Sequence, residues 1–231
     1  MELYEVMRTT FAARQYTGEE LPDEVLYELL DNARFAPSGG KVWFGGEDIT
    51  ALAQHERVKR GMTRTFQINT LFAGLTVLES VILAIQERRG LQYKWYQTVA
   101  SQTDVVDEAM ALLESLKLRQ EANSITRSLA YGKQRLVEIA LALATQPKVL
   151  LLDEPAAGIP SAESRELFEV IAQLPREVTI VFIEHDMGLV FRFAERITVL
   201  VGGKVLVEGT PAEIAADQRV KEVYLGEAEH A

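Results

Sequence analysis

The stretch Leu150-Leu151-Leu152-Asp153-Glu154-Pro155 places two adjacent carboxylates at the end of an apolar run. A buried strand holds the side chains at its carboxyl end rigidly at one edge of a parallel sheet, where open α/β sheets bind their ligands. A second apolar run, Ile180 to Ile183, is followed closely by His185. The sequence therefore predicts an α/β fold whose strand ends carry two carboxylates and an imidazole.

These side chains have the chemistry of a nucleotide-hydrolysing site. Asp153 would hold Mg²⁺ through its water shell, Glu154 would orient or deprotonate the water that attacks the γ-phosphate, and His185 would donate to the developing charge. Gln67 would sense both the metal and the water. Taken singly, Asp153 and Glu154 also fit an ordinary strand end, and His185 fits a structural histidine. The order of Gln67, Gly132 and His185 along the chain favours the site.

Length and composition limit the architecture and the kinds of partner. A chain of 231 residues with 48% hydrophobic content can bury the core of one ordinary domain, or of one domain plus a short appendage. No apolar run approaches the roughly 20 residues that cross a bilayer. The net charge of −10 argues against nucleic acid as a partner. There is no signal-peptide pattern and no cysteine, so we expect a cytoplasmic location.

The first forty residues differ from the rest of the chain. Residues 1–40 contain eight acids and three bases, a balance of −5, and the rest of the chain carries the other −5. Apolar residues at helical spacing predict one helix before Thr17-Gly18 and a second one that stops at Pro37. From Lys41 the period changes to two, which predicts a short strand at Val42-Trp43-Phe44 with Gly45-Gly46 as its turn. We therefore expect a two-helix N-terminal segment, residues 1–40, joined to an α/β domain of residues 41–231.

The first segment resembles the N-terminal end of the flavin-dependent nitroreductase family through Ala12-Ala13-Arg14-Gln15-Tyr16 and Ala36-Pro37-Ser38. The resemblance implies FMN as a cofactor, with Arg14 as the partner of its phosphate and Ser38 as a further contact. The chain departs from the family at Ala12, where the family has serine, and it lacks the family's asparagine after the Pro-Ser-Gly-Gly turn. The alternative is a pair of surface helices that bind no cofactor.

Residues 38–231 resemble ATP-binding cassette ATPases, specifically those of branched-chain amino acid uptake transporters. The motifs that carry the resemblance are Arg64-Thr65-Phe66-Gln67 as the glutamine loop, Leu129 to Arg135 as the signature loop, Leu150 to Glu154 as the Walker B strand, and Glu184-His185-Asp186 as the switch histidine. The resemblance implies an incomplete P-loop NTPase fold with a helical subdomain at roughly residues 75–135. It also implies ATP and Mg²⁺ as cofactors, with Asp153 and Gln67 as metal contacts.

Partners follow from the same resemblance. It implies membrane permease subunits and a second ATPase subunit, identical or different, with the chain held peripherally at the inner face of the plasma membrane. In such dimers the signature loop closes over the ATP of the other chain, so Ala130, Gly132, Lys133 and Gln134 would contact the partner's ATP through a helix N-terminus. Ala130 stands where the family has serine, and Lys133 replaces its glutamine. The alternative for this loop is a plain helix cap.

The phosphate-binding half of the site has no counterpart in the sequence. Gly-Lys occurs at Gly40-Lys41, Gly132-Lys133 and Gly203-Lys204, followed by Val, Gln and Val, so none of the three is a phosphate loop with a Walker A lysine. Both family patterns contain a Pro-Ser-Gly-like turn near residue 40. A gene fusion at that turn, which replaced the first strands of the cassette with nitroreductase-like residues, explains the pattern.

Three functions remain open from the sequence. The first, which the resemblance implies, is that the chain is by descent an ATP-binding subunit of an importer for branched-chain or other hydrophobic amino acids, with impaired ATP binding when alone. Alternatively, it is an accessory subunit that lends its signature loop to an intact partner ATPase. The third alternative is a remnant of an FMN-dependent nitroreductase, for which only Arg14 and Ser38 speak.

Overall fold

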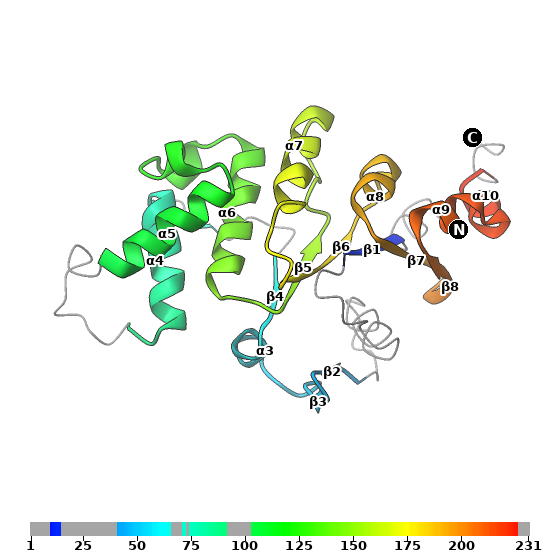
Figure 1. The fold of residues 1–231 in the computed structure, drawn as a ribbon, viewed down its shortest axis with the longest axis horizontal. Helices are drawn as coiled ribbons and strands as arrows, with labels where there is room; N and C mark the ends of the chain where they lie inside the picture. Colours follow the sequence, from blue (N-terminus) through cyan, green and yellow to red (C-terminus); the bar gives the residue numbers. More distant parts are fainter. Residues whose placement is uncertain (1–9, 15–40, 66–70, 73, 92–102, 226–231) are drawn as a thin grey trace.

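The computed structural model describes residues 10–14, 41–65, 71–72, 74–91 and 103–225, and for residues 10–14 and 224–225 it describes the backbone alone (Figure 1). Within these residues a six-stranded sheet has the order β4-β5-β6-β1-β7-β8. Strands β4, β5 and β6 are parallel, whereas β1 is antiparallel to both of its neighbours and β8 is antiparallel to β7. The strands are β1 (Thr10–Arg14), β4 (Met62–Arg64), β5 (Val149–Asp153), β6 (Thr179–Ile183), β7 (Arg196–Val201) and β8 (Lys204–Gly209).

Strand β1 corrects the prediction for the start of the chain. A helix was predicted before Thr17-Gly18, and this is wrong for residues 10–14, which pair with β6 on one side and β7 on the other. Without β1, both β6 and β7 would present unpaired backbone N–H and C=O groups inside the sheet, and buried groups of this kind need partners. The pairing requirement of the sheet therefore overrides the weak helical spacing of the sequence.

The direction of β1 decides where the chain leaves the sheet. Phe11 pairs with Ile183 at the end of β6, and Arg14 pairs with Ile180 near its beginning. Three residues of strand separate these positions, which is about 10 Å. Asp153 pairs in register with Ile183, at the other end of β6. Arg14 therefore lies at the end of the strands opposite to the end that carries Asp153.

A group of helices packs beside the sheet. It comprises α4 (Val77–Arg88), α5 (Thr103–Ser115) and α6 (Tyr131–Ala144), with short 3₁₀ turns at Arg119–Glu121 and Thr126–Ser128 (Figure 1). The described residues of the subdomain expected at roughly 75–135 are thus mainly helical. Helix α4 begins with the capping box that Thr-x-x-Glu encodes, because Thr76 Oγ1 accepts from the N–H of Glu79 at 3.2 Å and the Thr76 N–H donates to Glu79 Oε2 at 2.8 Å.

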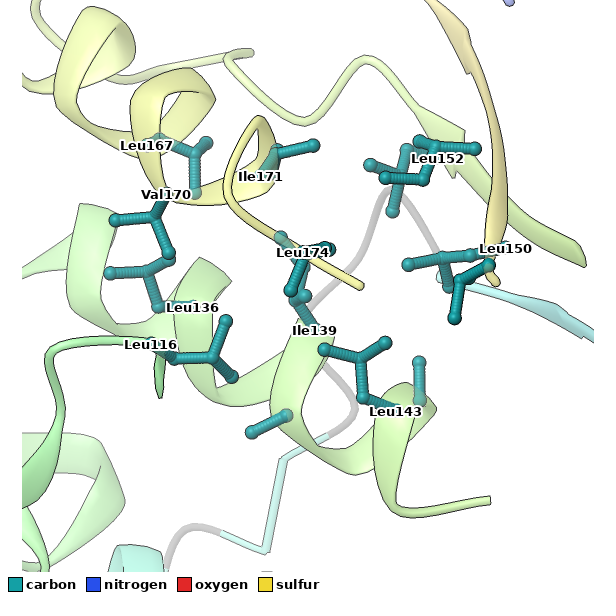
Figure 2. Packing of buried hydrophobic residues seen from close by; sticks show 14 of the residues in the cluster. Leu116, Leu136, Ile139, Leu143, Leu150, Leu152, Leu167, Val170, Ile171 and Leu174 are labelled. Carbon is teal, nitrogen blue, oxygen red and sulfur yellow. The ribbon is translucent and has the colours of Figure 1, made fainter. Parts of the chain in front are cut away.

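One apolar core joins these helices to the sheet. Figure 2 shows side chains of α6 and of α7 (Ser161–Ile171) meeting Leu150 and Leu152 of β5. Leu150 and Leu152 are 0% and 1% exposed, and both belong to the same buried cluster as Leu136, Ile139 and Leu167. Packing on this face fixes the direction of β5, and hence the position of the carboxylates that follow it.

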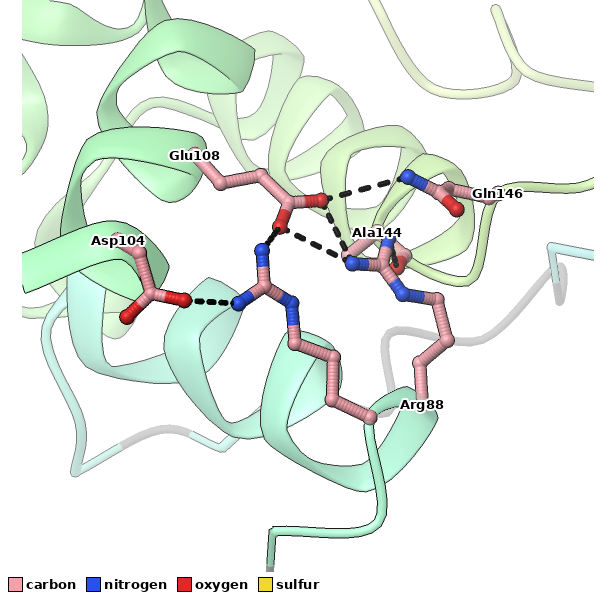
Figure 3. Close-up of polar contacts among 6 residues, drawn as sticks. Arg88, Asp104, Glu108, Ala144 and Gln146 are labelled. Carbon is pink, nitrogen blue, oxygen red and sulfur yellow. Dashed lines mark hydrogen bonds and ion pairs between the residues drawn. The ribbon is translucent and has the colours of Figure 1, made fainter. Parts of the chain in front are cut away.

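Two arginines at the end of α4 hold the helical group together (Figure 3). Arg88 donates to the carbonyl of Ala144 at 3.0 Å and to Glu108 at 2.7 Å, so it joins α4 to both α5 and the end of α6. Arg89 forms ion pairs with Asp104 and Glu108 of α5. Both arginine side chains thus have partners within the protein.

The remaining elements surround the sheet. In the view of Figure 1, α7 and α8 (Met187–Phe193) lie above the strands, and α3 (Gln54–Arg60) lies below them with the β2–β3 hairpin. The hairpin pairs β2 (Trp43–Phe44) with β3 (Glu47–Asp48) through Gly45 and Gly46, whose φ values of 59° and 82° suit glycine, and this confirms the predicted strand and turn. Helices α9 (Pro211–Ala216) and α10 (Gln218–Leu225) follow β8. None of the described helices is long and apolar enough to span a bilayer.

Candidate functional site

Parallel pairing of β5 with β6 brings the predicted residues to one edge of the sheet. Asp153 is in register with Ile183, so Glu154 and His185 follow the ends of neighbouring strands. His185 Nδ1 lies 3.9 Å from Glu154 Oε1 and 4.0 Å from Glu184 Oε2. The structure therefore places Glu154 and His185 together, with Nδ1 of the imidazole near two carboxylates. Their catalytic roles stay predictions.

Asp153 has a cationic partner within the sheet. Its Oδ2 accepts from Nη2 of Arg64 at 2.8 Å, and the Asp153 side chain is 11% exposed. Arg64 is the last residue of β4, and Gln67, which follows it, lies outside the described residues. The structure thus positions β4, the strand that precedes Gln67, and not Gln67 itself.

The described residues do not by themselves form a metal centre. Among them no group of three or more His, Cys, Asp or Glu side chains could hold a metal ion. Mg²⁺ commonly binds proteins through one or two carboxylates together with substrate phosphates. Asp153 supplies one carboxylate, and Arg64 already occupies one of its oxygens. The described residues therefore offer a divalent cation one carboxylate, and its other ligands would come from water or from phosphate oxygens.

Glu154 has an unusual backbone conformation. Its φ is 45°, in the left-handed region that costs a non-glycine residue roughly 1–2 kcal/mol. Two hydrogen bonds hold it there: the Glu154 N–H donates to the carbonyl of Ile183 at 3.0 Å, and the N–H of Ala157 donates to the Glu154 carbonyl at 3.0 Å. The sharp turn directs the chain away from β5 immediately after the two carboxylates.

Sequence reasoning missed the role of Glu184. Its side chain is 1% exposed, and its Oε1 accepts from the N–H of Ala156 at 2.8 Å. Burial raises the pKa of the Glu184 carboxyl above its ordinary value, while the hydrogen bond from Ala156 and the nearby His185 lower it. In the sequence, Glu184 is a single glutamate between an apolar run and a histidine. Its hydrogen-bond partner Ala156 lies 28 positions away, so no local pattern indicates the contact.

The residues predicted to contact a partner's ATP lie at the N-terminus of α6. Ala130 is the N-cap and its side chain makes no capping hydrogen bond. Lys133 forms an ion pair with Glu121, and the Gln134 side chain donates to the carbonyl of Leu129 at 2.9 Å. Lys133 and Gln134 thus have partners within the chain, and their contact with ATP stays a prediction.

Gly132 and Tyr131 connect this helix end to the loop that follows Glu154. A Cβ at Gly132 would lie 2.9 Å from Glu163 Oε2 and 3.8 Å from a methyl group of Ile159. A Cβ at Gly158 would meet the Tyr131 ring at 3.4 Å. The loop between β5 and α7 begins at Glu154 and therefore joins the site to the start of α6, which it contacts.

The predicted flavin contacts are not part of this geometry. Arg14 ends β1 near the opposite edge of the sheet, and its side chain is outside the described part of the chain. Ser38 also lies outside the described residues. FMN binding through Arg14 and Ser38 stays a prediction.

Comparison with known proteins agrees with the fold. The ABC transporter family model matches residues 26–157, and the model for the branched-chain amino acid ATP-binding cassette transporter matches residues 204–230. The branched-chain amino acid transport ATP-binding protein LivG of Salmonella typhimurium is 39% identical over 201 residues, covering 84% of this chain and 79% of the relative. BraF of Pseudomonas aeruginosa is 38% identical over 203 residues, covering 84% of this chain and 79% of that protein.

Solved structures lead to the same family. The ADP conformation of the ATP-binding cassette MJ1267 aligns with a TM-score of 0.67 and 30% identity, covering 82% of this chain and 78% of that one. A nucleotide-free ATP-binding cassette aligns with a TM-score of 0.67 over 94% of this chain and 98% of that one, at 23% identity, which bears on the fold alone. The strand order, the carboxylates after β5 and these matches together show that the chain belongs to the ABC transporter family and has the fold of its ATP-binding subunits.

Proposed function

We propose that this chain is the ATP-binding subunit of an importer for branched-chain or other hydrophobic amino acids. The observation that carries the proposal is the match of residues 204–230 to the branched-chain amino acid cassette family, since the rest of the chain is also similar to cassettes with other cargo. One such relative is the lipopolysaccharide export protein LptB of Haemophilus influenzae, at 33% identity over 189 residues. The relatives LivG and BraF support the amino acid assignment by name.

The proposed partners are membrane permease subunits and a second ATPase subunit, with the chain bound peripherally at the cytoplasmic face of the membrane. The names of LivG and BraF describe transport ATP-binding proteins, and such a protein depends on a separate membrane path for its cargo. This chain contributes no described membrane-spanning helix of its own.

We further propose that the chain binds ATP poorly when alone. A phosphate loop follows a strand that ends at the ligand edge of the sheet and leads into a helix N-terminus. On the side of β6 away from β5, the neighbouring strand is β1, which is antiparallel to β6. The chain therefore leaves β1 at the end of the strands opposite to the ligand-binding end. Nowhere in the sequence is Gly-Lys followed by Ser or Thr. The support for impaired binding is therefore both the strand direction and the missing motif.

In a dimer with an intact ATPase, the N-terminus of α6 would close over the ATP of the partner. Gly132 and its neighbours would then contribute to the partner's site, whereas Glu154 and His185 would have no nucleotide of their own to act on. Where a nucleotide did reach this edge, Glu154 would orient the attacking water, and His185 would donate toward the charge that develops on the phosphate.

A thermal melt with and without Mg-ATP tests the chain alone. Ligand at about 100 times its Kd would stabilise the fold by roughly 2.7 kcal/mol. Because we propose that the chain alone binds ATP poorly, we expect an unchanged melting temperature, and a clear rise contradicts the impairment. Flavin absorbance of the same sample tests the nitroreductase alternative, for which a colourless protein is expected.

Transport with an intact partner ATPase and the permease subunits tests the dimer. Substitution Gly132→Glu should abolish the contribution of this chain, because a carboxylate at the helix N-terminus repels phosphate. A side chain at Gly132 also meets Glu163, so the variant must melt at the wild-type temperature for the result to count. Glu154→Gln, the matched control at the opposite side of the site, should leave transport unchanged. Equal effects of the two substitutions contradict the accessory role.

A further inference from the structure

Glu184 combines nearly complete burial with a long-range contact to the turn that carries Glu154. A buried carboxylate is costly unless hydrogen bonds compensate for its lost hydration. The side chain is 1% exposed, and its Oε1 accepts from the N–H of Ala156 at 2.8 Å. Ala156 is only two residues beyond Glu154. Glu184 thus connects the end of β6 to the loop that follows β5.

This contact differs in kind from the other hydrogen bonds of the turn. The bonds from the Glu154 N–H to Ile183 and from the Ala157 N–H to Glu154 use backbone atoms alone, so many sequences could form them. The acceptor for the Ala156 N–H is a side chain, so it depends on the residue at position 184. A left-handed Glu154, with φ of 45°, persists only where its surroundings determine the conformation.

The same carboxylate also lies beside the imidazole. Its Oε2 is 4.0 Å from His185 Nδ1, and Glu154 Oε1 is 3.9 Å from that nitrogen. Both distances exceed a hydrogen bond, so the relationship is one of placement and charge. The Glu184 side chain, immediately after β6, therefore contacts the backbone of the turn that follows Glu154 and also lies near the ring of His185.

The anchored loop continues to the start of α6. Gly158 lies against the Tyr131 ring, and Ile159 lies near Gly132. A displacement of the turn at Ala156 would therefore be transmitted over two to three residues to the helix end that we propose to face a partner's ATP. This gives Glu184 a connection to both sides of the loop.

From these contacts we infer that Glu184 is a positioning residue: through the Ala156 N–H it holds the loop that places Glu154 beside His185 and supports the N-terminus of α6. The link to ATP hydrolysis rests on the proposed function, whereas the positioning of the loop does not. The residue touches no reacting atom in this arrangement, and it acts through the turn.

Two variants separate the hydrogen bond from the charge. Glu184→Gln keeps an oxygen that can accept from Ala156 at nearly the same shape, and Glu184→Met keeps the approximate volume but removes the acceptor. Amide exchange of Ala156 should be at least tenfold faster in Glu184→Met than in the wild type and within threefold of the wild type in Glu184→Gln. The NMR signal of His185, one of only three histidines in the chain, should move in Glu184→Met.

The contrary results are equally defined. Unchanged exchange at Ala156 in a folded Glu184→Met protein overturns the inference, as does equal acceleration in the Gln and Met variants. If Glu184→Met does not fold, the wild type still decides: its Ala156 amide must exchange at least 100-fold more slowly than in a free chain, and fast exchange overturns the inference. These readouts need no nucleotide, so they stand even if the transport assignment fails.

Transport by the assembled complex with an intact partner ATPase gives the functional arm. In the proposed dimer the loop reaches ATP only through the N-terminus of α6, so Glu184→Met should raise the ATP concentration for half-maximal transport several-fold, and Glu184→Gln should restore it. Normal transport alongside accelerated exchange at Ala156 refutes the functional part of the inference. Absence of transport in the wild-type complex refutes the proposed function instead.

Discussion

Arg64 and Asp153 form an ion pair across two parallel strands, with Nη2 of Arg64 2.8 Å from Oδ2 of Asp153. Arg64 is in register with Leu151, so its side chain reaches diagonally to the residue two positions further along β5. The side chains are 29% and 11% exposed. The carboxylate predicted to hold Mg²⁺ is therefore neutralised by a guanidinium from the strand that leads to Gln67, and a cation approaching Asp153 must compete with Arg64.

Loss of this pair should destabilise the protein. Arg64→Met leaves a largely buried carboxylate without its cationic donor, and we expect unfolding in urea to require about 1–2 kcal/mol less. The control is Arg119→Met, because Arg119 and Glu114 are 58% and 63% exposed and such pairs contribute about 0–1 kcal/mol. Equal effects of the two substitutions would mean that Arg64 adds nothing beyond a surface charge.

The central place of β1 predicts a strong effect of proline. Ala12 pairs with Phe182 of β6 and with Ile197 of β7, so its backbone lies between two strands. Ala12→Pro should cost at least about 1–3 kcal/mol, because proline lacks the N–H, leaves a strand carbonyl without its donor and is excluded from central strands. Ala12→Val, which suits a strand, is the control in a thermal melt. If both variants melt alike, residues 10–14 do not hold this position.

The network at the end of α4 predicts a further stability effect. Glu108 accepts from both Arg88 and Arg89, so Glu108→Gln weakens the junction of three helices (Figure 3). We expect the free energy of unfolding to fall by about 1–2 kcal/mol. Glu114→Gln, in the exposed pair with Arg119, should change it by less than about 0.5 kcal/mol. A smaller effect at Glu108 than at Glu114 contradicts a structural role for the network.

Two glutamates should give opposite pH dependences of stability. The pKa of Glu184 is raised, mainly by burial, so the folded state binds more protons and the stability contributed is present below the ordinary value of 4.5 and lost as the pH rises through the folded pKa. Glu184→Gln removes this loss. Its stability relative to the wild type should therefore increase between pH 4.5 and pH 7.5 in urea titrations.

Glu213 provides the comparison of opposite sign. Hydrogen bonds from the backbone and side chain of Thr210, at the start of α9, lower the pKa of Glu213 below 4.5. Its contribution is present above 4.5 and lost as the pH falls through the folded pKa. Glu213→Gln should thus be more destabilising at pH 7 than at pH values below the folded pKa of Glu213. The same sign of change for both variants contradicts these pKa shifts.

Local patterns in the sequence were sufficient for several parts of the fold. The apolar runs before Asp153 and His185 became β5 and β6, and Gly45-Gly46 formed a hairpin turn. Each of these features depends on neighbouring residues: a continuous apolar stretch for a buried parallel strand, and positive φ for the turn. The expectation of the cassette fold came from the resemblance to ATP-binding cassette ATPases, whose motifs occur in the same order along this chain.

By itself, then, the sequence determined the strand ends that carry Asp153, Glu154 and His185, because burial and turn chemistry are local properties. Only the tertiary structure decided their partners: Arg64 is 89 positions from Asp153, and Glu184 is 28 positions from Ala156. It also decided that residues 10–14 form a strand, and in which direction. Such pairings depend on the register between distant strands and on the demand of buried backbone groups for partners, which no periodicity within a short segment can express.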